Sequence, residues 1–169
     1  MTIEEAIKTA INYEVKIRDL YKKNSDTLNN PVAKKIFKVL ADEEQLHVEY
    51  LKNSLNEWKK SGIVNTKTLE TIVPDKDAVE AGIQKLKKED AEYDIKEEIE
   101  IFKKVLKLEI ESTNFYKNMI KDFPEESQAN FARLIEIEEG HEMIIQAEID
   151  QANKLGFWFD FMEFDLEAG

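Results

Sequence analysis

The sequence predicts an all-α protein in which four antiparallel helices form a bundle of two helical hairpins joined by one long crossover. Four long stretches repeat apolar residues at helical spacing. Short breaks divide the first stretch from the second and the third from the fourth, whereas about 30 residues separate the two pairs, enough to cross a whole bundle. The 169 residues include only five glycines and three prolines, too few for an all-β fold with many tight turns.

The first hairpin is predicted over residues 2–28 and 31–60. Asn29 and Asn30 interrupt the helical pattern, and Pro31 suits the first turn of the second helix, where a backbone N–H has no intrahelical partner. Gly62 is the expected stop signal, because glycine readily adopts the left-handed backbone that ends many helices.

The second hairpin is predicted to begin with a helix over residues 94–122, with Asp94 as N-cap. Phe123 and Pro124 divide it from a second helix that runs to about Leu155, with Gly156 as stop signal. The bundle thus covers residues 1–155. Its crossover covers residues 61–93, where β-branched residues and a proline disfavour a long helix, although 77–88 could form a short one. The tail, 156–169, has five aromatic residues between positions 157 and 164. It either covers one end of the bundle or forms an oligomer contact.

Charge and composition exclude several classes of function. The formal net charge of −12 opposes binding to nucleic acid or to an anionic membrane. No apolar run has the length of a membrane span, and the acidic start is unlike a secretory signal, so the cytoplasm is the expected location. The sequence contains no cysteine, which excludes disulfides, thiolate metal sites, a cysteine nucleophile and iron–sulfur clusters within it.

Each predicted helix places one glutamate at mid-length on its apolar face. The four are Glu14, Glu44, Glu109 and Glu138. His47 and His141 follow Glu44 and Glu138 by three residues, so each histidine shares a face with its glutamate. Four buried carboxylates without a lysine or arginine among them would be costly as bare charges, and two divalent cations would neutralise them. Carboxylate and imidazole ligands suit iron, manganese or zinc. The pattern predicts a dimetal site.

The competing interpretation is a coincidence among solvated glutamates. Both histidines have a glutamate three residues before them, which has a chance probability of roughly 2%. The halves also repeat each other, because Tyr21 follows Glu14 and Tyr116 follows Glu109 at the same spacing. This internal repeat favours the metal site.

Several nearby side chains have more than one interpretation. Tyr21 and Tyr116 are either ordinary core tyrosines or donors of a hydrogen bond to a ligand carboxylate of the opposite hairpin, which would tune the metals. Glu148 is expected to extend toward the end of the bundle or to pair with a base. The other flanking glutamates are expected to lie on the solvated face. They are Glu43, Glu111, Glu139 and Glu142.

These residues resemble the rubrerythrin branch of the ferritin-like superfamily. The resemblance rests on Glu14 with Tyr21, residues 42–51, Glu109 with residues 115–116, and residues 138–142. It implies a ferritin-like bundle with a dinuclear, usually di-iron, site held by the four glutamates and two histidines. It further implies that Glu44 and Glu138 bridge the metals and that His47 and His141 are terminal ligands.

The resemblance also implies an activity, in which the reduced di-iron centre reduces hydrogen peroxide to water and a rubredoxin-type iron centre reduces it again. Two features depart from the family. The sequence has no cysteines for a rubredoxin-like domain, so electrons must come from an external donor. Position 112, where rubrerythrins tend to carry a further carboxylate, is Ser112, and Glu111 points elsewhere on an ideal helix. Both departures bear on peroxidase activity rather than on metal binding.

The leading hypothesis is therefore a di-iron oxidoreductase that uses hydrogen peroxide and an external electron donor such as a rubredoxin-type protein. Three alternatives stay open. One is ferroxidase and iron-storage activity with dioxygen, another is a bundle whose metal is structural and redox-silent, and the weakest is a substrate hydroxylase. Two iron ions are the expected cofactors, with manganese or zinc possible, and a homodimer is the expected assembly.

Overall fold

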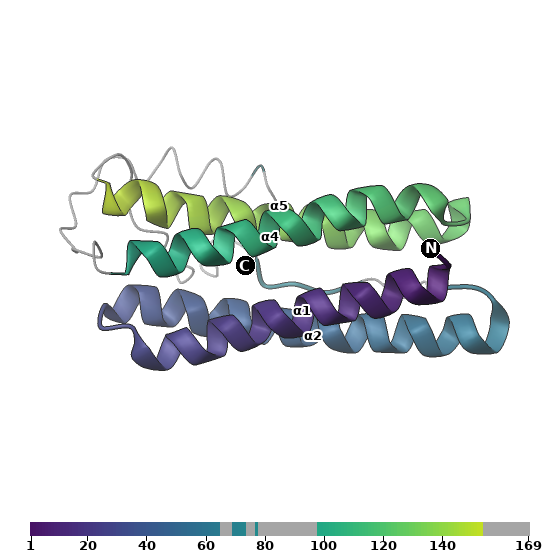
Figure 1. Cartoon of the computed structure of the whole chain (residues 1–169), viewed down its shortest axis with the longest axis horizontal. Helices are drawn as coiled ribbons and strands as arrows, with labels where there is room; N and C mark the ends of the chain where they lie inside the picture. Colours follow the sequence, from purple (N-terminus) through teal and green to yellow (C-terminus); the bar gives the residue numbers. More distant parts are fainter. Residues whose placement is uncertain (65–68, 74–76, 78–97, 154–169) are drawn as a thin grey trace, which may run out of the picture.

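A computed structural model describes residues 1–64, 69–73, 77 and 98–153 of the chain. The described helices are α1 (Ile3–Thr27), α2 (Pro31–Ser61), α4 (Ile99–Met119) and α5 (Glu125–Ala152), with a 3-10 turn η1 (Ile120–Asp122) between the last two. Figure 1 shows α1 and α2 as one antiparallel hairpin that lies along the hairpin of α4 and α5. The predicted all-α four-helix bundle is confirmed.

Local contacts close the ends of the first hairpin. The Thr2 hydroxyl accepts a hydrogen bond from the Glu5 amide (3.2 Å), and the Glu5 carboxylate accepts one from the Thr2 amide (2.8 Å), which closes a capping box on α1. α2 begins at Pro31, as predicted, and ends at Ser61, one residue after the predicted end. Gly62 has φ +71°, and its amide donates to the Trp58 carbonyl at 2.8 Å.

The start of α4 differs from its prediction. The helix begins at Ile99 with Glu98 as its N-cap residue, later in the chain than Asp94, which is outside the described residues. The nearly buried Glu98 carboxylate accepts hydrogen bonds from the backbone amides of Asn29 (2.6 Å) and Asn30 (3.1 Å). Glu98 thereby connects the second hairpin to the turn of the first. The expected tail, its stop at Gly156 and all of the expected short helix except Asp77 are outside the described residues.

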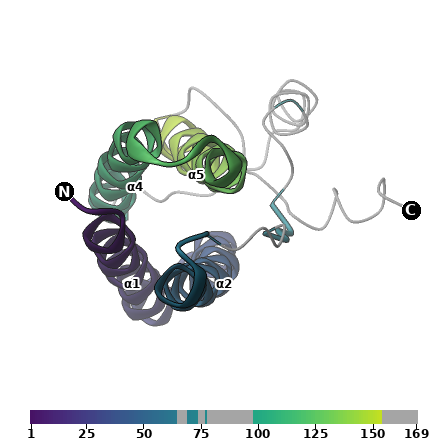
Figure 2. The same ribbon diagram turned by 90° about the vertical axis from the view of Figure 1, so that its right-hand side faces the viewer.

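The four helices form a ring when the bundle is viewed along its axis (Figure 2). On one side of the ring α1 lies next to α4, and on the other side α2 faces α5. Two apolar clusters fill the interior. One contains Ile17, Phe37, Phe102 and Ile144 among others, and the other contains Ala10, Leu51, Phe131 and Leu134 among others. The predicted metal-binding residues lie between these clusters along every helix. The bundle therefore has an apolar core on both sides of one polar layer.

The described part of the crossover lies outside the ring, on the side where α2 and α5 face each other (Figure 2). Leu69 and Val73 are buried there, and Val73 belongs to one of the two core clusters. This segment therefore packs on the bundle. None of the described helices combines the length and the apolar character that crossing a membrane requires.

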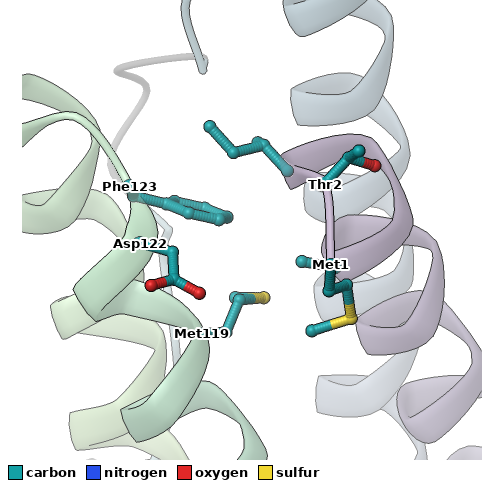
Figure 3. Close-up of a pocket in the computed structure, with 7 residues that line it drawn as sticks. Met1, Thr2, Met119, Asp122 and Phe123 are labelled. Carbon is teal, nitrogen blue, oxygen red and sulfur yellow. The ribbon is translucent and has the colours of Figure 1, made fainter.

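A small pocket lies at the end of the bundle where α1 begins and α4 ends. Figure 3 shows Met1 and Thr2 on one side of it and Met119, Asp122 and Phe123 on the other. Its lining includes none of the buried glutamates or histidines of the polar layer. The pocket is thus separate from the candidate metal centre.

Candidate metal centre

The polar layer contains all six predicted metal-binding residues, and each is completely buried. They are Glu14, Glu44, His47, Glu109, Glu138 and His141. Helical spacing explains their position. On α1, for example, Glu14 lies one turn from Ala10 in one apolar cluster and one turn from Ile17 in the other. Apolar neighbours on the same face force each carboxylate into the core.

The six side chains form two overlapping groups, each compact enough to hold one metal ion. The first group is Glu14, Glu44, His47 and Glu138, and the second is Glu44, Glu109, Glu138 and His141. Within each group, one potential ligand atom per residue lies within 4.8 Å of the others. Glu44 and Glu138 belong to both groups. The arrangement thus has two adjacent centres with two shared carboxylates.

Both histidines direct Nδ1 at the carboxylates. His47 Nδ1 lies 2.8 Å from Glu138, 3.1 Å from Glu14 and 3.2 Å from Glu44. His141 Nδ1 lies 2.7 Å from Glu44 and 3.7 Å from Glu138. The two imidazole rings stack nearly parallel, with centroids 5.4 Å apart and an interplanar angle of 10°. Each ring therefore presents the same nitrogen to the shared carboxylates.

Burial and mutual repulsion perturb the carboxyl groups strongly. Desolvation, reinforced by repulsion from Glu138 and Glu44, raises the pKa of Glu14 well above its usual value. Desolvation and repulsion from neighbouring carboxylates also raise the pKa values of Glu44 and Glu109. Burial acts to raise the pKa of Glu138 as well, but attraction to His47 lowers it overall. Without metal, this layer therefore retains protons that exposed carboxylates would release.

The histidines respond in opposite directions. Burial acts against a charged His47, yet the carboxylates of Glu138 and Glu44 raise its pKa well above the usual value. Burial lowers the pKa of His141. An ionised Glu138 beside a charged His47 is thus the favoured ion pair of the metal-free site.

Unsatisfied polar atoms show that the residues fit a metal site. Both carboxylate oxygens of Glu44 and of Glu138, and both ring nitrogens of His141, are buried without a well-aligned hydrogen bond in the described part of the chain, although the carboxylates lie at ion-pair distance from the histidines. Leaving such groups unpaired is costly, whereas divalent cations would satisfy them together. Oxygen and imidazole donors suit iron, manganese and zinc.

The two predicted tyrosines connect the hairpins. Tyr21 on α1 donates a hydrogen bond to the Glu109 carboxylate on α4, and Tyr116 on α4 donates one to the Glu14 carboxylate on α1. Both tyrosines are completely buried. The hydrogen bonds to the opposite hairpin are thus present, and the effect of these tyrosines on bound metals stays a prediction. Desolvation, followed by repulsion from Glu109, also raises the pKa of Tyr21 well above its usual value, so this hydroxyl stays a donor.

The prediction of a solvated Glu43 was wrong. Its side chain is only 1% exposed and accepts hydrogen bonds from Thr71 and Ile72 of the crossover. The spacing contained a signal, because Glu43 follows the buried Leu40 by three residues and precedes His47 by four, which places all three on one side of α2. Its partners in the crossover could not be found from helical periodicity.

The other flanking glutamates differ in their exposure to solvent. Glu148 is completely buried, which rules out the alternative in which its side chain extends to solvent, and its pairing with a base stays a prediction. Glu111 is exposed, as expected, and Glu139 is partly exposed in an ion pair with Lys117 (2.7 Å). Ser112 is buried, and its hydroxyl donates to the Glu109 carbonyl (2.9 Å) instead of supplying a further ligand carboxylate.

Comparison with protein families gives one finding that bears on this geometry. The family model described as Rubrerythrin matches residues 5–107. The match includes Glu14, Glu44 and His47. Beyond it lie Glu109, Glu138 and His141, which the structure places in the same buried groups. Comparisons with curated proteins and with solved structures gave no match.

Proposed function

The chain belongs to the rubrerythrin family, and on this premise we propose that it is a di-iron oxidoreductase that reduces hydrogen peroxide to water. The observation that carries the proposal is the pair of overlapping buried groups that share Glu44 and Glu138. Two metals held by these groups would share two carboxylates and would therefore lie close together, which suits the two-electron reduction of one small oxidant. The family suggests iron, and the donor set is compatible with it.

In this proposal each residue of the polar layer has a defined role. Glu44 and Glu138 would be shared by the two metals, Glu14 and His47 would complete one ligand set, and Glu109 and His141 would complete the other. Two ferrous ions bound there would supply two electrons which, with two protons, convert hydrogen peroxide to two molecules of water. The protein supplies the geometry and a dry interior for this chemistry.

The chain's own residues hold that geometry. Tyr21 and Tyr116 fix the carboxylates of Glu109 and Glu14 from the opposite hairpin, which keeps the two halves of the site in register. The apolar clusters on both sides exclude bulk water. Because water is excluded, each charge in the layer has a stronger effect on its neighbours than it would at the surface.

We further propose that electrons come from an external donor, such as a rubredoxin-type protein, because the sequence has no cysteines for a rubredoxin iron centre of its own. The homodimer stays a prediction that follows from the family resemblance. Its test is light scattering, which would also detect a cage able to store iron.

Anaerobic stopped-flow spectroscopy tests the proposed reaction. Protein loaded with two ferrous ions is mixed with one equivalent of hydrogen peroxide or, separately, with dioxygen. Faster oxidation by peroxide, with both irons oxidised by one equivalent, would support the proposal. The Glu44→Ala variant controls for iron that is not bound at this site.

The other outcomes point to the alternatives. Faster oxidation by dioxygen together with a large hollow assembly would favour a ferroxidase and iron-storage protein. A native metal that cannot be oxidised, such as zinc, would favour a structural site. Either result would contradict the peroxidase proposal while leaving the dimetal geometry intact.

A further inference from the structure

A further buried carboxylate lies beside the four glutamates and two histidines of the metal centre. Glu43, on α2, is only 1% exposed, although it belongs to neither of the two groups that share Glu44 and Glu138. It forms a group of its own with the two histidines. One of its oxygens and one nitrogen each of His47 and His141 lie within 4.8 Å of one another.

Each of the two histidines has a second ring nitrogen that does not face the ligand carboxylates. Both rings direct Nδ1 at the ligand carboxylates, which leaves Nε2 as the outer nitrogen. In the described residues Nε2 of His47 and Nε2 of His141 are buried and have no hydrogen-bond partner. A metal-binding histidine usually donates its second ring N–H to a carboxylate, a carbonyl or water, and this contact fixes both the tautomer and the ring orientation.

The crossover holds Glu43 in place. The Thr71 hydroxyl donates to one carboxylate oxygen, and the Ile72 amide donates to the other at 3.2 Å. The Thr71 hydroxyl in turn accepts a hydrogen bond from the Val73 amide at 3.0 Å. Each carboxylate oxygen can accept more than one hydrogen bond, so both retain capacity toward the histidines. This crossover segment lies at the side of the bundle where α2 and α5, the two histidine-bearing helices, face each other (Figure 2).

We propose that Glu43 is a positioning residue, which accepts the outer N–H of the ligand histidines and connects the crossover to the metal centre. This role explains why a glutamate is buried at position 43 although it lies in neither ligand group. It also explains why the crossover contacts α2 beside the histidines. The inference rests on the metal site of the proposed function and not on its reaction with peroxide.

Cobalt(II) titration of the Glu43→Gln variant tests the proposal. The amide preserves the size of the side chain but removes the charge that stabilises the ring N–H. We expect two cobalt ions per chain with an affinity about 10- to 100-fold lower than that of the unchanged protein. The matched control is Asp42→Asn, which removes the charge of the exposed neighbouring residue and should leave the affinity within about two-fold.

A second readout separates positioning from general stability. In the cobalt-loaded protein the exchangeable ring N–H protons of His47 and His141 give proton resonances shifted by the metal. We expect Glu43→Gln to move these resonances and to speed their exchange with water. Thr71→Val, which leaves the carboxylate in place but removes one of its anchors, should produce a smaller change in the same direction.

Three results would overturn the proposal. Unchanged affinity and unchanged N–H resonances in Glu43→Gln would show that the carboxylate does not act on the histidines. A third cobalt ion that is lost in this variant would make Glu43 a metal ligand instead. If Glu43→Gln does not fold, Thr71→Val decides, and resonances identical to those of the unchanged protein would then contradict the proposed connection. Absence of peroxide reactivity would affect only the proposed function.

Discussion

The hydroxyl of Tyr116 on α4 donates a hydrogen bond to the carboxylate of Glu14 on α1. Tyr21 and Glu109 form the same contact in the opposite direction between the same two helices. Each hairpin thus contributes one tyrosine that holds a candidate ligand of the other. This exchange makes the two halves of the metal centre interdependent, and it agrees with the repeat seen in the sequence.

Removal of one such contact should weaken metal binding without destroying the site. In Tyr116→Phe the Glu14 carboxylate loses its donor but remains beside the metal position, so we expect two metals per chain and an affinity about ten-fold lower. Tyr13→Phe is the matched control, because Tyr13 is the neighbour of Glu14 on α1 but is partly exposed. Isothermal titration with cobalt(II) measures both variants, and equal affinities for the two would contradict the role of Tyr116.

The shared carboxylates should matter to both metals. Glu44→Ala and Glu138→Ala each remove a residue that belongs to both groups, so we expect either variant to lose stoichiometric iron binding altogether. Glu136→Ala, on the exposed face of α5, should bind iron normally. Iron analysis after gel filtration gives the counts. Full iron content in either shared-carboxylate variant would refute the assignment.

The metal-free protein should lose stability as the pH rises. Glu14, Glu44 and Glu109 have pKa values raised above 4.5, so the folded state keeps protons that the unfolded chain has released above that pH. The raised pKa of His47 acts in the same direction above 6.5. The lowered pKa of His141 opposes this effect near and below pH 6.5, whereas the lowered pKa of Glu138 acts only near and below pH 4.5.

Thermal unfolding from about pH 5 to about pH 8 measures this effect. We expect the Tm of the metal-free protein to fall across this range. Metal ligands must be deprotonated to bind, so added metal should stabilise the protein more at the higher pH. A Tm of the metal-free protein that rises steadily with pH would show that the buried carboxyls do not retain their protons.

The connection between the hairpins at Glu98 should contribute to the free energy of unfolding. Glu98→Ala leaves the amides of Asn29 and Asn30 without their acceptor, which should cost about 1–3 kcal/mol. Glu100→Ala removes an exposed carboxylate from the same helix and should change stability by less than about 0.5 kcal/mol. Urea unfolding of the metal-free variants provides the comparison, and equal losses would argue against the Glu98 contact.

The central part of the site could be predicted from the sequence because it depends on helical periodicity alone. Once Glu14 lies between Ala10 and Ile17 on one face of α1, packing of the apolar clusters must bury it. The same argument applies to Glu44 and His47 on α2. The fold class followed from the same pattern, together with the two short breaks and the long crossover.

The features that periodicity missed depend on contacts between distant segments. Glu43 is buried because Thr71 and Ile72 return to α2, and the sequence contains no sign of that contact. The late start of α4 has a similar origin, since Glu98 contacts the turn at Asn29 and Asn30. In both cases a buried carboxylate accepts hydrogen bonds from a segment that is distant in the sequence.

An anaerobic ferrous titration of the metal-free protein tests the central claim most directly, because it counts tightly bound iron per chain. The two overlapping groups predict two equivalents, and Glu44→Ala should abolish both. A titration that shows no tight binding, or only one equivalent in the unchanged protein, would contradict the dinuclear centre.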